Sequence, residues 1–568
     1  MSPQSAPPRS GDDSHAPAPP AASGVRARLR TFVTGLHVDE TDPVGVPLTP
    51  DEKGRLRAVR RFGATGTVLM AVAALGAGAG PVVQNPVYGQ RLWGLPARMP
   101  SVSLTVAFTG ALMLVGAWLM LGRYALGRRG ADGRTRRLSR TGFDRTLLLW
   151  MLPLLVVPPM YSKDVYSYLA QSEIAARGMD PYELGPAQAL GIDHTLTRTV
   201  PNIWRETPAP YEPLFLWIGK LIGAVTGENI IAGVLVHRAV EIVGLVLIVW
   251  ALPRLARRCR VAPVAALWLG AANPLVLLHL VAGVHNEALM MGLMTAGLEL
   301  SLRALDAAGP LSARAWLLFA VGSGLIVLSS AIKIPTLLAL GFTGLALARR
   351  LGGRLITVIA VAAALATLTV AITVAVAFGT GLGFGWLDTL GTAGEVRSWL
   401  SLPTLAGLAA GGIGILLGLG DHISAVLTLT HALGLAVMAA VSLRMLLWVH
   451  QGRIDPVGGL GISMALLVLL FPVAHPWYLV WALVPLAAWA SRPIILRPAI
   501  AISAVISLVG PMPNGAAYPP FMIVQAATVV VIAALAILWT TRNRLPWRSA
   551  VAWDDHAAPQ TPTVVHRD

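Results

Sequence analysis

Cysteine and charge are both scarce in this chain. A single cysteine, Cys259, among 568 residues excludes an intramolecular disulfide framework. Charged residues make up 13% of the sequence, roughly half of their share in soluble domains, while hydrophobic residues make up 55%. So little polar surface cannot cover a water-soluble fold of this size, and the composition is typical of a membrane protein.

Sequence signatures for nucleotide phosphates are absent as well. There is no GxxxxGK[ST] segment and no GxGxxG after a predicted strand, the two glycine-rich patterns that cradle such phosphates. No spacing of His, Cys, Asp or Glu requires a metal centre. The net charge of +16 does not indicate nucleic acid, because many of the basic residues lie beside apolar runs, as membrane topology favours.

Long apolar runs are present instead. Ile230–Leu252, Arg354–Phe378 and Phe521–Trp539 are mostly apolar over 17 or more residues, and about 20 residues cross a bilayer as a helix. Backbone groups in lipid must pair within their own segment, which favours helices, and the alternating pattern of a membrane barrel is missing. The sequence predicts an all-α, polytopic bundle of transmembrane helices.

Arginine clusters indicate the orientation. The loop Gly122–Arg145 contains eight arginines, and further clusters occur at Arg254–Arg260, Arg349–Arg354, Arg492–Arg497 and Arg542–Arg548. Basic loops remain in the cytoplasm, so we expect a multi-pass protein of the plasma membrane with both termini inside. This threading gives about 14 spans, within a range of roughly 13 to 16.

Each span has an expected range. The spans are 63–84, 101–122, 144–160, 229–252, 262–283, 287–303, 315–332, 334–349, 354–378, 422–447, 457–475, 477–490, 494–511 and 518–541. Two further apolar segments, Leu214–Val225 and Leu405–Gly420, would put arginines on the wrong side if they crossed. We expect both to be re-entrant or interfacial.

Domain limits follow from the same pattern. We expect a disordered cytoplasmic tail at 1–48, a basic interfacial helix at 49–62, a transmembrane domain at 63–541 and a second cytoplasmic tail at 542–568. The first tail is rich in Pro, Ala, Ser and Gly, which disfavours a packed core. The interfacial helix begins with Thr49 as its cap and Pro50 at its first position. Within the transmembrane domain, 161–213 is the first large extracytoplasmic loop.

An ionisable pair marks the start of this loop. Lys163 and Asp164 lie just beyond the third apolar run, and Val165–Arg177 has helical character. Charged residues at the mouth of a span are costly to hold there and indicate function by default. The simpler alternative is that the pair only marks the membrane boundary.

More acids, bases and aromatic residues fall on the same predicted face. They are Arg205, Tyr211 and Glu212 in the first loop, His285, Asn286 and Glu287 in a turn, Lys333 and Arg397 in two other loops, and His475, Trp477 and Tyr478 in another turn. Taken singly, Trp477 and Tyr478 are typical of the interfacial aromatic belt. Taken together, the residues predict the rim of a pocket.

Four segments of this face resemble a known family. They are SKDVYSYLAQSEIAARGMDPYELGP, TPAPYEPLFLW, GVHNEALMMGLM and AHPWYLVWALVPL. Their combination is similar to that of actinobacterial polyprenol-phosphomannose-dependent α-(1→6)-mannosyltransferases of the MptB type, which belong to the GT-C superfamily. The resemblance covers roughly Phe62 to Arg544. It implies a GT-C-type fold in which extracytoplasmic loops form the active site and 63–541 is the catalytic domain.

The resemblance also implies a donor, an acceptor and a catalytic residue. The donor would be polyprenyl-phosphate-mannose, and the acceptor a mannosylated glycolipid that carries the α-(1→6)-mannan core of lipomannan and lipoarabinomannan. Asp164 matches the position of the catalytic acid in the first large loop. Transfer from a β-linked donor to an α-linked product is inverting, so one carboxylate can take the proton of the acceptor hydroxyl.

The remaining outer residues fit secondary roles in the same chemistry. For the donor phosphate we expect Lys163, Arg205, Lys333, Arg397, His285 and His475, because positive charge and hydrogen-bond donors stabilise a departing phosphate. For sugar or lipid we expect Tyr211, Glu212, Asn286, Glu287, Trp477 and Tyr478. No metal is assigned, although a divalent cation stays open, with Glu173, Asp180 or Glu287 as ligands.

Three other functions fit parts of the sequence. Another polyprenyl-phosphate-sugar-dependent glycosyltransferase would share every feature except the sugar. A lipid or sugar transporter should have charged or broken helices near the middle of the membrane, usually in paired halves. Here His237, Arg238 and Glu241 form an isolated polar group in one span, and we expect them to pair within the bundle. A non-catalytic scaffold would not need the outer acids and bases.

Overall fold

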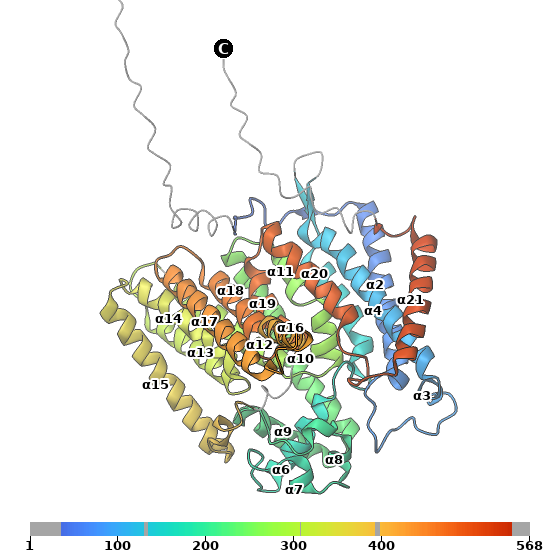
Figure 1. Ribbon diagram of the computed structural model, residues 1–568. Coiled ribbons are helices and arrows are strands. Elements are labelled where there is room, and N and C mark those ends of the chain that lie inside the picture. Colours follow the sequence, from blue (N-terminus) through green and yellow to red (C-terminus); the bar gives the residue numbers. More distant parts are fainter. Residues whose placement is uncertain (1–35, 130–133, 307, 392–397, 548–568) are drawn as a thin grey trace, which may run out of the picture.

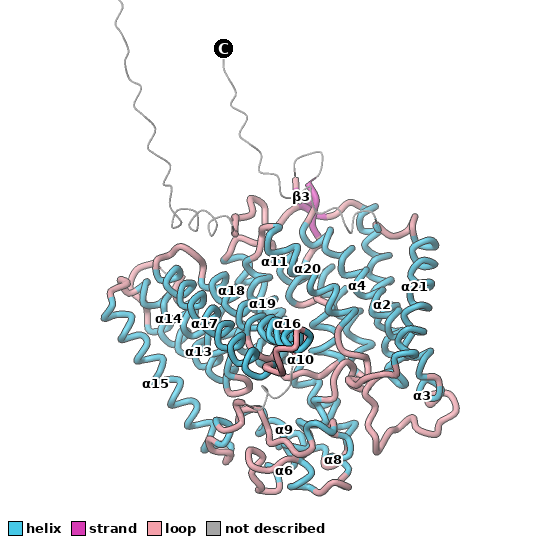
Figure 2. The backbone as a smooth tube through the Cα atoms, viewed as in Figure 1, coloured by secondary structure: helices cyan, strands magenta, loops and turns pink. Residues whose placement is uncertain are grey.

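The computed structural model describes residues 36–129, 134–306, 308–391 and 398–547, whose regular structure is almost entirely helical (Figures 1 and 2). The helices of ten or more residues are α2 (Pro50–Ala77), α4 (Pro100–Leu126), α5 (Arg140–Met151), α6 (Asp164–Ala176), α9 (Pro213–Thr226), α10 (Ile230–Arg258), α12 (Glu287–Ala304), α13 (Ala313–Ser330), α14 (Leu338–Arg350), α15 (Leu355–Thr380), α16 (Leu402–Leu416), α17 (Ile423–His450), α18 (Pro456–Leu470), α19 (Leu479–Trp489), α20 (Pro493–Val509) and α21 (Pro520–Thr541).

Short helical turns join these elements. The α-helical ones are α3 (Leu95–Arg98), α7 (Pro186–Leu190), α8 (Thr195–Thr199) and α11 (Pro263–Gly270). The 3-10 turns are η1 (Leu152–Leu155), η2 (Asn202–Trp204), η4 (Ile334–Leu337), η5 (Gly385–Leu387) and η7 (Pro476–Tyr478), and η3 (Val276–Ala282) is a π-helix.

Three short strands lie at the upper end of the bundle in Figure 2. They are β1 (Val46–Pro47), β2 (Arg128–Arg129) and β3 (Thr135–Arg137), in the order β1-β3-β2, with β1 parallel and β2 antiparallel to β3. Arg137 joins this sheet to the chain before α2. Its Nη2 lies 2.6 Å from Oε2 of Glu40, and its Nη1 donates to the carbonyl of Asp42 at 2.9 Å.

Seven helices in the described ranges are long and apolar enough to cross a membrane, namely α2, α4, α10, α13, α15, α17 and α21. The pair η3 and α12, bent by 111°, would be an eighth span if it counts as one. The helices α9, α16, α18, α19 and α20 are apolar but shorter. The chain is therefore a multi-pass, all-α membrane protein, as its composition predicts, and the count of about 14 spans stays a prediction.

Two of the expected spans are interrupted. The range 144–160 includes most of α5, which gives way to the 3-10 turn η1 at Leu152. The helix ends there because Pro153 has no backbone N–H to donate. The range 262–283 contains α11, which ends at Gly270 before the π-helix η3. Asn273 terminates α11, since its side chain donates to the carbonyl of Leu269 at 3.0 Å and accepts the N–H of Leu275 at 3.0 Å.

The expected helix start at Thr49 is present. The Thr49 hydroxyl accepts the N–H of Glu52 at 3.3 Å, and the Glu52 carboxylate accepts the N–H of Thr49 at 2.9 Å. This capping box stabilises the first turn of a helix. The helix then continues to Ala77 as α2, so the basic segment 49–62 forms one continuous helix with the apolar segment that follows.

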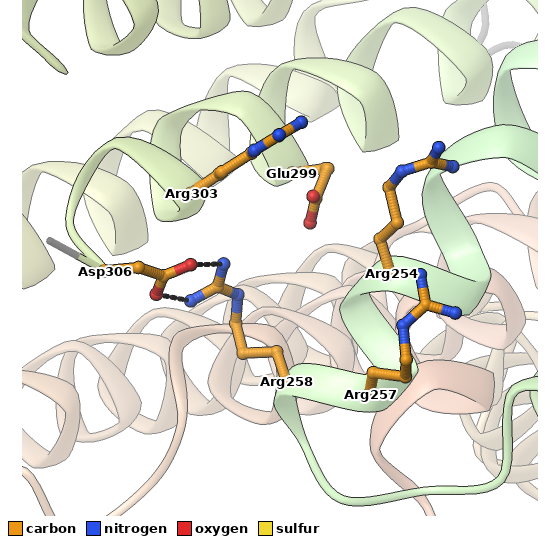
Figure 3. Close-up of a pocket in the computed structure, with 6 residues that line it drawn as sticks. All are labelled: Arg254, Arg257, Arg258, Glu299, Arg303 and Asp306. Carbon is orange, nitrogen blue, oxygen red and sulfur yellow. Dashed lines mark hydrogen bonds and ion pairs between the residues drawn. The ribbon is translucent and has the colours of Figure 1, made fainter. Parts of the chain in front are cut away.

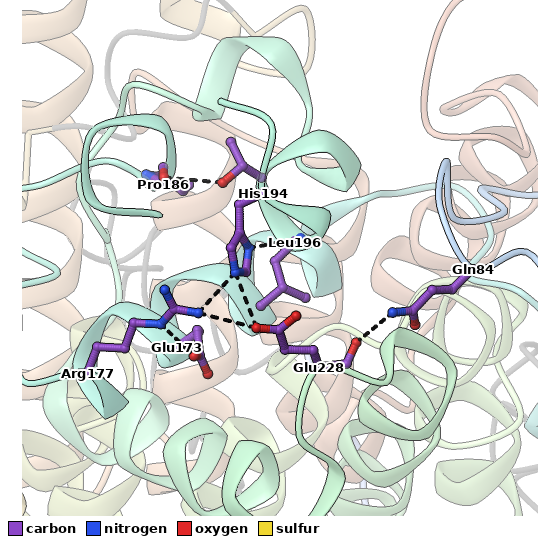
Figure 4. Close-up of polar contacts among 8 residues, drawn as sticks. Gln84, Glu173, Arg177, Pro186, His194, Leu196 and Glu228 are labelled. Carbon is purple, nitrogen blue, oxygen red and sulfur yellow. Dashed lines mark hydrogen bonds and ion pairs between the residues drawn. The ribbon is translucent and has the colours of Figure 1, made fainter. Parts of the chain in front are cut away.

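Helices α6, α7, α8 and α9 form a layer below the long helices in Figure 1. The predicted helix Val165–Arg177 is α6, and the segment Leu214–Val225, expected not to cross, is α9, which packs on α6 and α10. Exposed polar contacts meet at the turn before α10 (Figure 4): Arg177 Nη2 of this layer lies 3.3 Å from Oε1 of Glu228, and Gln84, from the loop after α2, donates to the carbonyl of Glu228 at 3.1 Å.

Candidate active site

Asp164 lies at the start of α6, beside the turn that precedes α12. Its Oδ2 is 3.7 Å from Nδ1 of His285, and the same nitrogen is 3.6 Å from Oε2 of Glu287. Lys333, just before η4, forms an ion pair with Oε1 of Glu287. Three separate parts of the chain thus bring two acids, an imidazole and a lysine together. We call Asp164, His285, Glu287 and Lys333 the Asp164 cluster.

The chain before Asp164 is held in an uncommon conformation. Tyr161 has φ of +66°, in the left-handed region that residues other than glycine rarely adopt. Its N–H donates to the carbonyl of Pro513 at 2.8 Å. The hydroxyl of Ser162 then accepts the backbone N–H of Asp164 at 3.0 Å. These contacts fix the first turn of α6, and with it the carboxylate.

The environment of Asp164 raises the pKa of its carboxyl group. Burial raises the pKa of Asp164 to about 6, Lys333 and Ser162 act in the opposite direction, and Glu287 raises the pKa further. The side chain keeps 24% of its surface exposed, so a substrate can reach it. A carboxylate with this pKa is ionised at neutral pH and is a stronger base than an ordinary aspartate.

The turn that carries His285 is strained. Val284 has φ of +59°, which is a genuine outlier for a β-branched residue. Such a strained conformation persists only where surrounding contacts hold the backbone in place, and it is common at functional sites. Arg238 of α10 supplies part of that restraint, because its Nε donates to the carbonyl of Val281 at 3.0 Å and its Nη2 to that of Ala282 at 3.3 Å.

The polar group inside α10 supports the same turn. Arg238 also donates to the carbonyl of Leu155 at 2.7 Å, and Oε2 of Glu241 accepts the N–H of Leu289, in the first turn of α12, at 2.9 Å. The expected pairing within the bundle is confirmed for Arg238 and Glu241. It is wrong for His237, whose ring nitrogens have no hydrogen-bond partner in the described ranges and whose ring packs near that of Tyr168, with centroids 5.9 Å apart.

Glu212 and Glu287 hold the segment around Lys333 from two sides. Oε1 of Glu212 accepts the N–H of Ile334 at 3.0 Å. Burial raises the pKa of Glu212 to about 8, against the effects of its hydrogen bonds and of Lys333, so the group is largely neutral at pH 7. Burial opposes the charge on Lys333, but the ion pair with Glu287 raises the pKa of its ammonium group above the ordinary value.

Aromatic rings form the wall beside the cluster. Trp477 stacks on His285, with centroids 3.9 Å apart, and on His475, with centroids 4.7 Å apart. The Lys333 ammonium lies 5.1 Å from the ring centre of Tyr478 and 5.8 Å from that of Tyr211, within the range of cation–π attraction. The aromatic residues expected at the site are therefore present, although Trp477 is buried in a stack.

Three more cations were expected at the site, and the two that are described have different environments. Burial, and after it the positive charge of Arg205, lower the pKa of Lys163, the residue before Asp164. Arg205 also holds its own loop, since its guanidinium donates to the carbonyl of Val200 at 3.0 Å and to that of Arg198 at 2.9 Å. Arg397 lies outside the described residues.

Several buried polar atoms at the cluster have no hydrogen-bond partner among the described residues. They include both side-chain polar atoms of Asn286, both ring nitrogens of His285 and Oε2 of Glu287. All three residues are fully buried. Buried polar groups are normally paired, and each exception calls for an explanation such as a bound ligand. These atoms are therefore candidates for contacts with a ligand.

The carboxylates considered as metal ligands do not gather. Glu173 pairs with Arg177 at 2.7 Å, and Asp180 accepts the N–H of Tyr182 at 2.7 Å, so Glu287 alone of the three belongs to the Asp164 cluster. Across the described ranges, no group of three or more His, Cys, Asp or Glu residues is arranged to hold a metal ion.

Three residues that support the site lie outside the predicted set. They are Ser162, Trp481 and Arg238, the last of which the sequence predicts only to pair within the bundle. The signal for Ser162 was its place two residues before Asp164, where a hydroxyl can accept a backbone N–H. Trp481, one turn after Tyr478, stacks on it with centroids 4.1 Å apart.

Comparison with known proteins covers most of the chain. The family described as "Alpha-(1->6)-mannopyranosyltransferase, N-terminal domain" matches residues 60–349, and the MptB C-terminal domain matches residues 403–539. The chain belongs to the α-(1→6)-mannopyranosyltransferase family. The first matched range contains Asp164, His285 and Lys333, and the second contains His475 and Trp477, so both parts of this family's sequence contribute to the site.

Relatives within the family align over nearly their full length. A probable α-(1→6)-mannopyranosyltransferase of Mycolicibacterium smegmatis is 53% identical over 544 residues, 93% of this chain and 96% of that protein. An α-(1→6)-mannopyranosyltransferase of Mycobacterium tuberculosis is 53% identical, covering 92% and 94%. α-(1→6)-Mannopyranosyltransferase B of Corynebacterium glutamicum is 39% identical, covering 91% and 87%. No solved structure matches the chain. The chain is therefore a membrane glycosyltransferase. This excludes the alternatives of a transporter and of a non-catalytic scaffold.

Proposed function

We propose that this enzyme transfers mannose from polyprenyl-phosphate-mannose to a mannosylated lipid acceptor, with inversion, and forms the α-(1→6) linkages of a lipomannan and lipoarabinomannan core. The observation that carries the proposal is the carboxylate of Asp164 at a partly exposed position, 3.7 Å from His285, in a chain of the α-(1→6)-mannopyranosyltransferase family. Another polyprenyl-phosphate-linked sugar is the alternative donor.

Asp164 acts as the general base. The ionised carboxylate takes the proton of the acceptor's 6-hydroxyl as that oxygen bonds to the anomeric carbon of the donor. The bond from that carbon to the phosphate oxygen breaks, and its electron pair leaves with the polyprenyl phosphate. Charge on the sugar develops as in an oxocarbenium ion. A pKa near 6 for Asp164 leaves it ready to accept this proton at neutral pH.

Cations receive the leaving phosphate. The positive charge of Arg205 lowers the pKa of Lys163, and a phosphate bound by both side chains would relieve that repulsion. Lys333 is already paired with Glu287, so it would position that carboxylate as well as face the phosphate. His285 and His475 are proposed as hydrogen-bond donors to the phosphate, and Arg397 as a further cation.

Polar and aromatic side chains recognise the sugars and the lipid. The unpaired amide of Asn286 and the free Oε2 of Glu287 would bind sugar hydroxyls. Tyr211 and Tyr478, beside Lys333, would contact a sugar ring or the polyprenyl chain. Trp477 would form the floor below them, and Glu212 would keep the segment of Lys333 in place.

The membrane orientation is part of the proposal. Arginine-rich loops and both termini would face the cytoplasm, with about 14 spans in all. The layer of α6 to α9 would then lie at the extracytoplasmic surface of the plasma membrane, where a lipid-linked donor in the outer leaflet could reach Asp164.

A donor comparison tests the proposal. Membranes that contain the chain are given labelled polyprenyl-phosphate-linked mannose, arabinose or glucose together with a mannosylated lipid acceptor. We expect label from mannose alone in the acceptor, in a linkage cleaved by an α-(1→6)-specific mannosidase. Preferred transfer of arabinose or glucose would replace the proposed donor by the alternative.

A further inference from the structure

A cavity lies at the end of the bundle that is far from Asp164. Arg303 follows Glu287 on the same helix, α12, and lies roughly 24 Å further along its axis at the rise of an α-helix. The cavity there has a volume of about 670 Å³ (Figure 3). Its lining consists of Arg254, Arg257 and Arg258 from α10, Glu299 and Arg303 from α12, and Asp306 just beyond it.

Positive charge exceeds negative charge in this cavity. Arg258 is paired, since its Nη2 donates to Oδ2 of Asp306 at 2.7 Å, and Arg254 lies over the ring of Trp250. Arg257 and Arg303 are exposed, and within the described ranges their guanidinium groups make no hydrogen bond or ion pair. The four arginines face only two carboxylates, which leaves room for an anion.

A neighbouring cavity of about 440 Å³ shares Arg258 and Asp306 and adds an apolar wall. The wall is built by Leu302, Leu305, Ala346, Val449 and Pro456, beside Arg349, Arg350 and Asp455. Basic loops alone satisfy the topology rule and need no cavity. A basic cavity next to a cavity with an apolar wall fits a molecule with an anionic head group and a hydrocarbon tail.

We propose that this end of the bundle binds an anionic membrane phospholipid, with the head-group phosphate at Arg257 and Arg303 and an acyl chain against the apolar wall at Leu302. Guanidinium groups bind phosphate through two parallel hydrogen bonds, which favours arginine at such sites. Basic pockets between helices at the cytoplasmic surface bind anionic head groups in the same way. This site is independent of Asp164 and of the donor proposed above.

A lipid titration tests the proposal. The full chain in neutral detergent is titrated with short-chain phosphatidylglycerol, with phosphatidylcholine of the same chain length, or with inorganic phosphate, and the unfolding temperature is recorded. A ligand that binds only the folded state raises this temperature in a saturable manner. We expect this result with phosphatidylglycerol alone. Equal stabilisation by phosphatidylcholine, or full stabilisation by inorganic phosphate, would overturn the proposal.

Paired variants locate the site. Arg257→Gln with Arg303→Gln should weaken the binding of phosphatidylglycerol roughly 30-fold, because each basic residue near an anionic lipid contributes about a fivefold factor. The control, Arg57→Gln with Arg61→Gln, removes the same charge from exposed positions on α2 and should not alter binding. An equal loss in both variants would show a diffuse electrostatic effect and refute the site. If the double variant does not fold, each single variant should bind phosphatidylglycerol about fivefold more weakly than the original chain. The proposal fails if neither single variant does.

Discussion

At the scale of single residues, the reactivity of Asp164 depends on its surroundings. Burial and Glu287 raise the pKa of its carboxyl group, which is about 6 despite the opposing effects of Lys333 and Ser162. A general base must be ionised, so the rate of mannosyl transfer should fall as the pH drops through 6 and level off above about 7. The measurement is kcat/KM between pH 5 and 8. A rate that stays constant across that range would contradict the role of Asp164.

Ser162 tunes the same carboxylate. Its hydroxyl lowers the pKa of Asp164 and accepts the N–H of Asp164 at 3.0 Å. Ser162→Ala should therefore move the acid limb of the pH–rate profile to higher pH and leave the rate at pH 8 within a fewfold of the original. Ser172→Ala, further along α6, is the matched control. An unshifted profile in Ser162→Ala would make this hydroxyl a purely structural cap.

The residues of the Asp164 cluster were easier to predict from the sequence than the residues that hold them in place. Asp164, His285 and Glu287 could be singled out because ionisable residues beside apolar runs are rare. The strain at Val284 could not be foreseen, since a valine gives no local signal for a positive φ. Nor could the sequence link Arg238 to the turn before α12, because that contact depends on how α10 packs against it.

At the scale of elements, a buried ion pair joins α12 to the segment before η4. Glu287 is fully buried and Lys333 is 15% exposed. Breaking a buried pair from one side leaves an uncompensated charge and costs about 3 to 5 kcal/mol. Glu287→Gln and Lys333→Met should each lower the unfolding temperature strongly, and the double variant should lose less than the sum of the two.

A surface pair is the control for this cycle. Arg177 and Glu173 form an ion pair in which the side chains are 39% and 21% exposed, and such pairs are worth about 0 to 1 kcal/mol. Arg177→Met should thus have a small effect in the same unfolding assay. If Glu287→Gln is as mild as Arg177→Met, the buried pair does not hold α12 to η4.

Element limits were predictable where local chemistry sets them. The capping box at Thr49 and the helix after Asp164 are local signals, and both are found. Breaks inside apolar runs were harder to foresee. The runs 144–160 and 262–283 have the length of a span, yet Pro153 and Asn273 interrupt them, and hydrophobicity alone does not register such interruptions.

At the scale of the whole molecule, the proposed orientation puts the α6–α9 layer outside the cell. Cys259 is buried at 4% exposure, so the native chain offers no reactive surface thiol to an impermeant reagent. Asp193→Cys, in the exposed loop before α8, should react with an impermeant maleimide on intact cells. Arg57→Cys, on α2, should react only after the cells are permeabilised. The reverse pattern would invert the topology and place Asp164 in the cytosol.

Both matched parts of the family meet at the site. Residues 60–349 supply the Asp164 cluster and residues 403–539 supply His475 and Trp477. Trp477 stacks on His285, and His475 stacks on Trp477. Catalysis should therefore require the complete bundle. A sequence pattern can name residues on one face, but only the packed helices establish that they lie within a few ångströms of one another.

The initial rate of mannosyl transfer by purified Asp164→Asn tests the central claim most directly. The variant keeps the shape of the side chain and removes the base, so the rate from polyprenyl-phosphate-mannose should fall about 100- to 10,000-fold, with normal insertion into the membrane. Asp193→Asn, which changes an exposed carboxylate in the layer of α6 to α9, should keep the original rate. Transfer by Asp164→Asn at the rate of the original chain would contradict the account.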